Sequence, residues 1–127
     1  MDWTEIAALI ACLFGGGIGL YAMINPCWAS RLVRLVPREG KIEGKSEFRS
    51  TYGGLFLLGH AFAAWALLSN QPGGDLAAAA IGFTWLGSAV GRLISFVLDK
   101  TASPVNWFNV FLETLLGMLL LLPFLLT

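Results

Sequence analysis

Hydrophobic residues form four long runs along this chain, separated by three polar connections. The runs lie at about 6–24, 51–68, 76–98 and 105–126, each near the roughly 20 residues that a helix needs to cross a bilayer. None shows the strict alternation of a half-buried strand, and lipid excludes an open sheet. The pattern therefore predicts one all-α membrane domain over 1–127, an up-down bundle of four transmembrane helices.

Two of the connections are short turns between antiparallel helices. In "SNQPGGD", Pro72, Gly73 and Gly74 break the helix, and Asp75 is predicted to cap the next one. In "DKTASPV", Pro104 has the same role.

The remaining connection, between the first two runs, carries its own pattern. Asn25 is predicted to cap a short helix over about 26–36, with Pro26 at the favoured first position. Apolar residues fall on one side of this helix and arginines on the other or at its end, as in a helix that lies in the membrane interface. We expect Pro37 to end it. The mixed charges that follow are typical of a solvated loop.

The basic residues are distributed asymmetrically. Seven of the eight lie in two of the connections, Arg92 lies in the third run on the side of the "DKTASPV" turn, and the termini and the "SNQPGGD" turn have none. The positive-inside rule then places those connections in the cytoplasm and both termini on the opposite side of the membrane. The same bias argues against small multidrug exporters and fluoride channels, many of which insert in both orientations. The eight basic residues are Arg31, Arg34, Arg38, Lys41, Lys45, Arg49, Arg92 and Lys100.

Composition agrees with this topology and limits the chemistry. The chain is 57% hydrophobic and only 13% charged, whereas soluble domains carry about 25% charged residues. Asp2 and Glu5 give the start of the chain the wrong charge for a cleavable signal. Cys12 and Cys27 lie roughly 22 Å apart along a helix, too far for a disulfide. Without a Cys/His cluster, no metal or cofactor is expected, and a nucleic-acid partner is not expected either.

Three ionisable residues fall at membrane depth: His60, Arg92 and Glu113. Such groups cost about 2.5–3.5 kcal/mol on insertion scales, so they should face protein. Arg92 lies ten residues before the turn centre at Ala102, and Glu113 lies eleven after it. Equal path lengths in an antiparallel hairpin predict an Arg92–Glu113 ion pair. The pair either holds the third and fourth helices in register or forms part of a ligand site.

Other polar residues follow at helical spacing and define a candidate pocket near the cytoplasmic face. Ser88, Ser95 and Asp99 share a stripe with Arg92, and Asn106 and Asn109 share one with Glu113. The predicted pocket consists of Arg49, Tyr52, His60, Arg92, Ser95, Asp99, Asn109 and Glu113. For two of these residues a purely structural role stays open. Arg49 either belongs to the pocket or only reaches out to lipid headgroups or caps backbone carbonyls. His60 is either a core group with a hydrogen-bond partner, which is favoured, or a proton relay.

Small residues mark candidate packing faces between helices. They are Gly15, Gly19, Gly53, Gly54 and Gly91. Gly15 and Gly19 form a small-xxx-small pair that packs within the bundle or between subunits of a homo-oligomer. Gly53 and Gly54 are expected to leave room for a neighbouring backbone or for a long side chain such as Arg92.

Three segments together resemble a known family: "EFRSTYGGLFLLGHAF", "GSAVGRLISFVLDKTASP" and "NVFLETLLGMLLL". Their R-x-x-Y-G-G and G-R-x-I/L-S patterns and the final-helix carboxylate are similar to the bacterial domain of unknown function 4345, with a looser similarity to DoxX-like proteins. The resemblance covers nearly the whole chain and implies an integral membrane protein with no established activity. Its motif positions are Arg49, Tyr52, Gly53, Gly54, Gly91, Arg92, Ser95 and Glu113, without catalytic roles.

Three functions compete. The favoured one is a non-enzymatic protein that holds an anionic amphiphile, such as a lipid, between paired arginines, because guanidinium groups bind carboxylates and phosphates. The second is an enzyme on a lipid-soluble substrate with Glu113 or His60 as acid or base. The third is a small transporter, which the absence of broken helices or an internal repeat disfavours.

Overall fold

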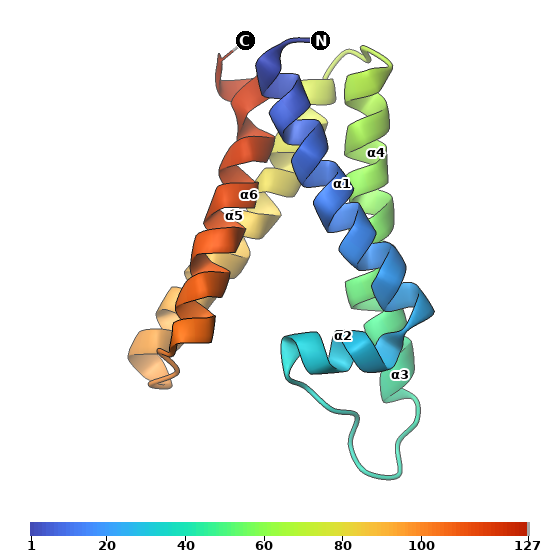
Figure 1. The fold of residues 1–127 in the computed structure, drawn as a ribbon, viewed down its shortest axis with the longest axis vertical. Coiled ribbons are helices and arrows are strands. Elements are labelled where there is room, and N and C mark those ends of the chain that lie inside the picture. The colour runs from blue at the N-terminus through green and yellow to red at the C-terminus, as the bar shows by residue number, and fades with distance from the viewer. Residues whose placement is uncertain (127) are drawn as a thin grey trace. The chain divides into compact units, whose positions relative to one another are not determined.

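A computed structural model describes residues 1–126 of the chain (Figure 1). All regular secondary structure in these residues is helical. A short π-helix, η1, directly precedes α4, and the two form one continuous helical stretch with α3. The elements are α1 (Trp3–Ile24), α2 (Pro26–Val33), α3 (Gly44–Glu47), η1 (Phe48–Leu55), α4 (Phe56–Leu68), α5 (Gly74–Leu98) and α6 (Pro104–Leu126).

Four helical stretches in residues 1–126 are long and apolar enough to cross a membrane: Trp3–Ile24, Gly44–Leu68, Gly74–Leu98 and Pro104–Leu126. The all-α class and the four spanning helices are therefore confirmed. The second stretch begins earlier than predicted, because the polar residues before Thr51 are already helical.

Contacts group the chain into two compact units. One comprises Met1–Ala11 and Ala63–Thr127, and we call it the hairpin unit because it contains α5 and α6. The other comprises Cys12–Phe62, and we call it the central unit.

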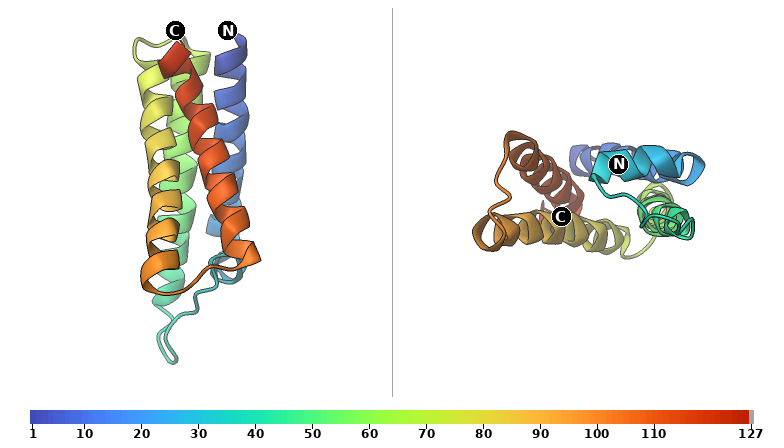
Figure 2. Two further views of the ribbon diagram at one scale, coloured as in Figure 1. Left: turned by 90° about the vertical axis from the view of Figure 1, so that its left-hand side faces the viewer. Right: turned by 90° about the horizontal axis from the view of Figure 1, so that it is seen from below.

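In the hairpin unit, α5 and α6 pack against each other as an antiparallel pair (Figure 2). Gly82 permits the close approach: a Cβ there would lie 2.8 Å from the Gly117 carbonyl oxygen. Leu116, Leu120 and Leu121 are buried along α6. The N-terminus of the chain and the C-terminal end of α6 lie at one end of this unit, and the α5–α6 turn lies at the other (Figures 1 and 2).

The turn before α5 differs from the prediction. Gly73, with φ of 83°, is the N-cap, and its carbonyl accepts the first helical hydrogen bond from Ala77 at 2.9 Å. The predicted capping role of Asp75 is therefore wrong: Asp75 lies in the first helical turn. The chain needs a left-handed residue at the cap to leave the turn, and glycine adopts that conformation without strain.

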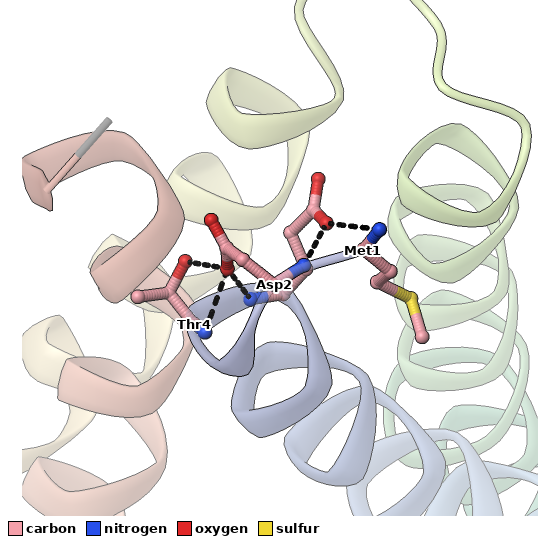
Figure 3. A network of polar contacts seen from close by, with 4 residues as sticks. Met1, Asp2 and Thr4 are labelled. Atoms are coloured by element: carbon pink, nitrogen blue, oxygen red, sulfur yellow. Dashed lines mark hydrogen bonds and ion pairs between the residues drawn. The ribbon is translucent and has the colours of Figure 1, made fainter.

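The N-terminus of α1 carries a capping box that sequence analysis did not identify (Figure 3). Asp2 Oδ1 accepts hydrogen bonds from Thr4 N at 2.8 Å, Thr4 Oγ1 at 2.6 Å and Glu5 N at 3.0 Å. Glu5 Oε2 accepts in return from Asp2 N at 2.8 Å. Hydrogen bonding, first from the Thr4 hydroxyl and then from the Glu5 amide, lowers the pKa of the Asp2 carboxyl. The "DWTE" spacing was the available signal.

In the central unit, α2 begins as predicted. Asn25 Oδ1 accepts from Trp28 N at 3.0 Å, and Pro26 occupies the first turn. The helix ends at Val33, however, and not near 36. Arg34 adopts a left-handed conformation with φ of 58°, and Leu35 N donates back to Ser30 O at 3.0 Å. This Schellman-type end already closes α2, so Pro37 does not stop it.

A small core holds α2 against its neighbours within the central unit. Ala22 of α1, Ala29 of α2 and Phe48 of η1 are buried together. Trp28, Val33 and Tyr52 pack against them. The sequence over Phe48–Leu55 adopts the wider π-helical turn, a form that occurs mostly as short interruptions of α-helices.

Candidate functional site

Arg92 of α5 and Glu113 of α6 lie in contact in the hairpin unit. Arg92 Nε donates to both carboxylate oxygens of Glu113, at 2.8 Å to Oε1 and 2.9 Å to Oε2. Ser88, one turn before Arg92, donates its hydroxyl to Glu113 Oε1 at 2.8 Å. The antiparallel hairpin brings these positions to one level, and the Gly82–Gly117 contact keeps the two backbones close.

The two partners of this pair differ in burial. The Glu113 side chain is only 7% exposed, whereas the Arg92 side chain is 34% exposed. Only Nε of Arg92 contacts the carboxylate. Within residues 1–126, the two terminal amino groups of Arg92 donate no hydrogen bond to protein. The site therefore combines a fully engaged carboxylate with a guanidinium that retains donors.

The other predicted pocket residues of the hairpin unit belong to its turn rather than to the ion pair. Ser95 Oγ donates to Asp99 Oδ2 at 2.8 Å and lies 2.9 Å from Thr101 Oγ1. Asn106 Nδ2 donates to Thr101 O at 2.7 Å. Ser95 and Asp99 thus organise the α5–α6 connection. Asn109 is half-buried on α6, one turn before Glu113.

Arg49 lies in the central unit, where it contacts the end of α1. Its NH1 group donates to the Met23 carbonyl oxygen and, at 3.5 Å, to that of Ile24. The last carbonyls of a helix have no partner within the helix and carry partial negative charge, so they suit a guanidinium. Of the roles that sequence analysis left open for Arg49, the geometry fits carbonyl capping.

His60 is 4% exposed in the central unit. Its Nδ1 lies 2.7 Å from the Phe56 carbonyl oxygen, and because a carbonyl only accepts, Nδ1 carries the proton. The ring stacks on Phe56 with centroids 5.7 Å apart. Gly15 of α1 faces the imidazole so closely that a Cβ there would overlap it. The backbone partner and the close packing fit the interpretation of His60 as a core group.

Tyr52 and the helix-two glycines pack inside the central unit. Tyr52 stacks on Phe48 with centroids 5.8 Å apart. A Cβ on Gly53 would lie 3.0 Å from Met23 N, so the backbone of α1 occupies the space beside it. Within the central unit, a neighbouring backbone therefore fills the space beside Gly53.

The remaining packing glycines divide into two groups. A Cβ on Gly19 would lie 2.9 Å from the Gly53 carbonyl oxygen, so Gly15 and Gly19 both pack within the chain. Gly54 meets only the Arg49 carbonyl oxygen, at 3.8 Å, and a Cβ on Gly91 would meet nothing within 4 Å among the described residues. Neither of these two glycines has a close helix neighbour among the described residues, and their packing roles stay a prediction.

The predicted pocket as one set spans both units. Arg49, Tyr52 and His60 belong to the central unit, and the other five belong to the hairpin unit. The structure brings together Arg92 with Glu113 and Ser95 with Asp99. A single pocket made by all eight residues stays a prediction.

Metal chemistry finds no support within residues 1–126. No group of three or more His, Cys, Asp or Glu residues is placed to hold a metal ion in that part of the chain. Cys12 is buried, Cys27 is exposed, and both are free thiols.

A comparison with family models shows to which family the chain belongs. The model of "Domain of unknown function (DUF4345)" matches residues 3–124. The chain belongs to this family. No curated protein and no solved structure matches it. In this DUF4345 protein, the R-x-x-Y-G-G segment forms most of η1, and the G-R-L-I-S segment and Glu113 lie on the two helices of the hairpin.

Proposed function

We propose that this DUF4345 protein is a multi-pass protein of the bacterial inner membrane, with both termini in the periplasm, that binds an anionic amphiphile such as a lipid at Arg92. The orientation rests on the basic residues, since seven of the eight in the sequence lie in or beside the two connections expected in the cytoplasm and the eighth, Arg92, lies in the half of its span nearer to one of them. The binding function rests on the geometry of the ion pair.

The observation that carries the proposal is the set of donors left on Arg92. A guanidinium presents five N–H donors, and Glu113 takes only the one on Nε. The terminal amino groups, which have no protein acceptor within residues 1–126, match the two oxygens of a phosphate or a carboxylate. In the low dielectric of a membrane, donors without an acceptor are costly, so a bound headgroup stabilises them.

The surroundings of Arg92 suit an amphiphile rather than a small soluble anion. Leu93, the residue after Arg92 on α5, is an exposed apolar side chain, and Phe96, one turn beyond Arg92, is half-buried. A molecule that places its headgroup on Arg92 can lay an acyl chain along such a surface. Glu113 meanwhile neutralises the charge of Arg92 and fixes the orientation of the Arg92 side chain by accepting hydrogen bonds from its Nε.

The acid/base alternative has less support. Glu113 receives hydrogen bonds on both oxygens, from Arg92 and Ser88, so a proton transfer would have to break these contacts first. His60 donates its Nδ1 proton to a backbone carbonyl, and its basic nitrogen, Nε2, is buried against Gly15 of α1, where a substrate has no room. Neither group therefore has the geometry of a general base that is ready to act.

The test compares lipids that co-purify with the full chain by native mass spectrometry in a mild detergent. Arg92→Lys keeps a positive charge for Glu113 but removes the paired terminal donors. We expect it to retain about tenfold less bound species, which corresponds to the loss of one charge-assisted hydrogen bond. Ser88→Ala is the matched control, because it removes a contact to Glu113 and leaves the Arg92 donors in place. Absence of any bound species in the unmodified protein, or equal retention by Arg92→Lys, would contradict the proposal.

A further inference from the structure

A cleft of about 330 Å³ lies wholly within the central unit, between α2 and the segment that leads into η1. Three apolar side chains line it: Pro26, Pro37 and Phe48. Its polar lining includes Ser30, Arg31 and Lys45. None of these residues belongs to the pocket predicted from the sequence, so the cleft is a second candidate site.

The walls of the cleft are held by specific contacts. The Schellman-type end of α2 reverses the chain, and the Ser30 hydroxyl donates to the Leu35 carbonyl oxygen. The returning chain brings Pro37 against Gly44, where a Cβ would lie 2.7 Å from Pro37 Cβ. Phe48 forms the apolar base, since it is 6% exposed and packs in the core with Ala22 and Ala29. These contacts make the cleft part of the fold.

The charge of the cleft is positive. Arg31 and Lys45 come from opposite walls, and no acidic residue lines the space. Within residues 1–126, no carboxylate lies in ion-pair range of either cation. Arg31 Nε donates to the Cys27 carbonyl oxygen at 3.3 Å, which orients the guanidinium and leaves its terminal amino groups available. Two cations that line one cleft without a counter-charge favour an anion between them.

The surroundings place this cleft at a lipid surface. Leu32, Leu35, Val36 and Ile42, which lie on α2 and the following loop, are all more than half exposed. Exposed apolar side chains beside basic ones are typical of segments that lie in the headgroup region. A volume of about 330 Å³ is at the lower end of ligand-site sizes, about 300–1,000 Å³, and suits a headgroup without its acyl chains.

We propose that Arg31 and Lys45 bind a phosphate group in this cleft, as carried by an anionic lipid headgroup or by a free phosphate ester. The guanidinium of Arg31 supplies paired donors to two phosphate oxygens, and the ammonium of Lys45 supplies a point charge from the other wall. Phe48 and the two prolines contact the glycerol or alkyl part next to the phosphate. This site is separate from Arg92 and does not depend on the function proposed there.

The test uses the full chain in nanodiscs that contain phosphatidylglycerol and phosphatidylcholine, with retained lipids counted by native mass spectrometry. We expect phosphatidylglycerol to be enriched on the unmodified protein. In an Arg92→Lys background, which removes the lipid proposed for the other site, the double variant Arg31→Gln/Lys45→Gln should lose this enrichment by about tenfold or more. The control Arg38→Gln/Lys41→Gln removes the same charge from the adjacent loop and should stay within about twofold of the unmodified protein.

A second arm titrates the same proteins with glycerol 3-phosphate and with inorganic phosphate. Binding that Arg31→Gln/Lys45→Gln abolishes supports the site and identifies a free phosphate ester as its source if phosphatidylglycerol is not enriched. Equal losses in both double variants would overturn the proposal, because general surface charge would then explain them. Absence of binding to every probe would also overturn it. Arg92→Lys should leave the cleft signal unchanged, and its loss there would show that Arg92, not the cleft, holds the phosphate.

Discussion

The hairpin unit and the central unit satisfy their intramembrane polar groups in different ways. In the hairpin unit, side chains pair with side chains: Arg92 and Ser88 donate to Glu113. In the central unit, side chains pair with backbone: Arg49 donates to carbonyls at the end of α1, and His60 donates to the Phe56 carbonyl. The first arrangement depends on two residues being present together, whereas the second depends on where a helix ends or how closely it packs.

Removal of Glu113 should have the largest effect on stability. Glu113→Ala leaves the guanidinium of Arg92 without its counter-charge, and breaking one partner of a buried pair costs about 3–5 kcal/mol. We expect the free energy of unfolding in mixed detergent to fall by about 3 kcal/mol, since Arg92 is partly exposed. The double variant Arg92→Met/Glu113→Leu removes both charges and should recover most of this loss. If the single and double variants are equally unstable, the hairpin does not depend on charge pairing.

The packing of α1 on His60 should come next. Gly15→Ala places a Cβ on the imidazole ring, and such overpacking costs about 1–3 kcal/mol. Gly91→Ala is the matched control, because its Cβ meets nothing among the described residues and alanine stabilises a helix by about 0.5–1 kcal/mol over glycine. Thermal unfolding of both variants checks the difference. Equal midpoints would mean that the Gly15–His60 contact does not restrain the central unit.

Arg49 should have a smaller and more local effect. Arg49→Gln removes a charged donor from the Met23 and Ile24 carbonyls, which we expect to cost about 1 kcal/mol. Hydrogen exchange should rise in the last turn of α1 and at the start of α2, with no change in α5 or α6. Lys45→Gln, a loss of the same charge outside this contact, is the control. Uniform exchange across α1 would argue against a capping role.

The N-terminal cap of α1 should give the smallest effect, and it should depend on pH. The hydrogen bonds from Thr4 and Glu5 lower the pKa of Asp2 below its ordinary value of 3.8. The cap therefore contributes fully above that ordinary value and is lost as the pH falls through the lowered one. Exchange of the Thr4 and Glu5 amides should rise in that acid range. Asp2→Ala should show the rise already at neutral pH, and a pH-independent profile in the unmodified protein would contradict the assignment.

The Arg92–Glu113 contact was accessible to sequence reasoning for a simple geometric reason. A short turn and a uniform helical rise place residues equally far from the turn at one level, and opposite charges at that level have each other as the nearest partner. The four spanning runs were predictable for a similar reason, because length and apolar content alone decide whether a helix can cross a bilayer. Ser88 lay on the predicted stripe, but only the contact shows that it donates to Glu113.

The backbone carbonyls that Arg49 and His60 contact could not be predicted in this way. Every residue carries the same carbonyl, so no residue type marks the one that Arg49 or His60 will meet. Which carbonyls are free depends on the helix end at Ile24, and which glycines pack depends on the line along which two helices touch. Gly15, Gly19 and Gly53 lie where two helices touch, whereas Gly54 and Gly91 do not lie at such a contact among the described residues.

The amino-acid sequence by itself determined the all-α class, the four spanning helices and the pairing of the two buried charges. The tertiary structure decided the end of α2, the contacts of Arg49 and His60, and the basic cleft of Arg31 and Lys45. The first set follows from the length of the hydrophobic runs and from the positions of the charges along them, which can be read directly from the sequence. The second follows from local backbone geometry, such as the left-handed residue Arg34 that ends α2, and from which helix surfaces lie against each other, as Gly15 and His60 do.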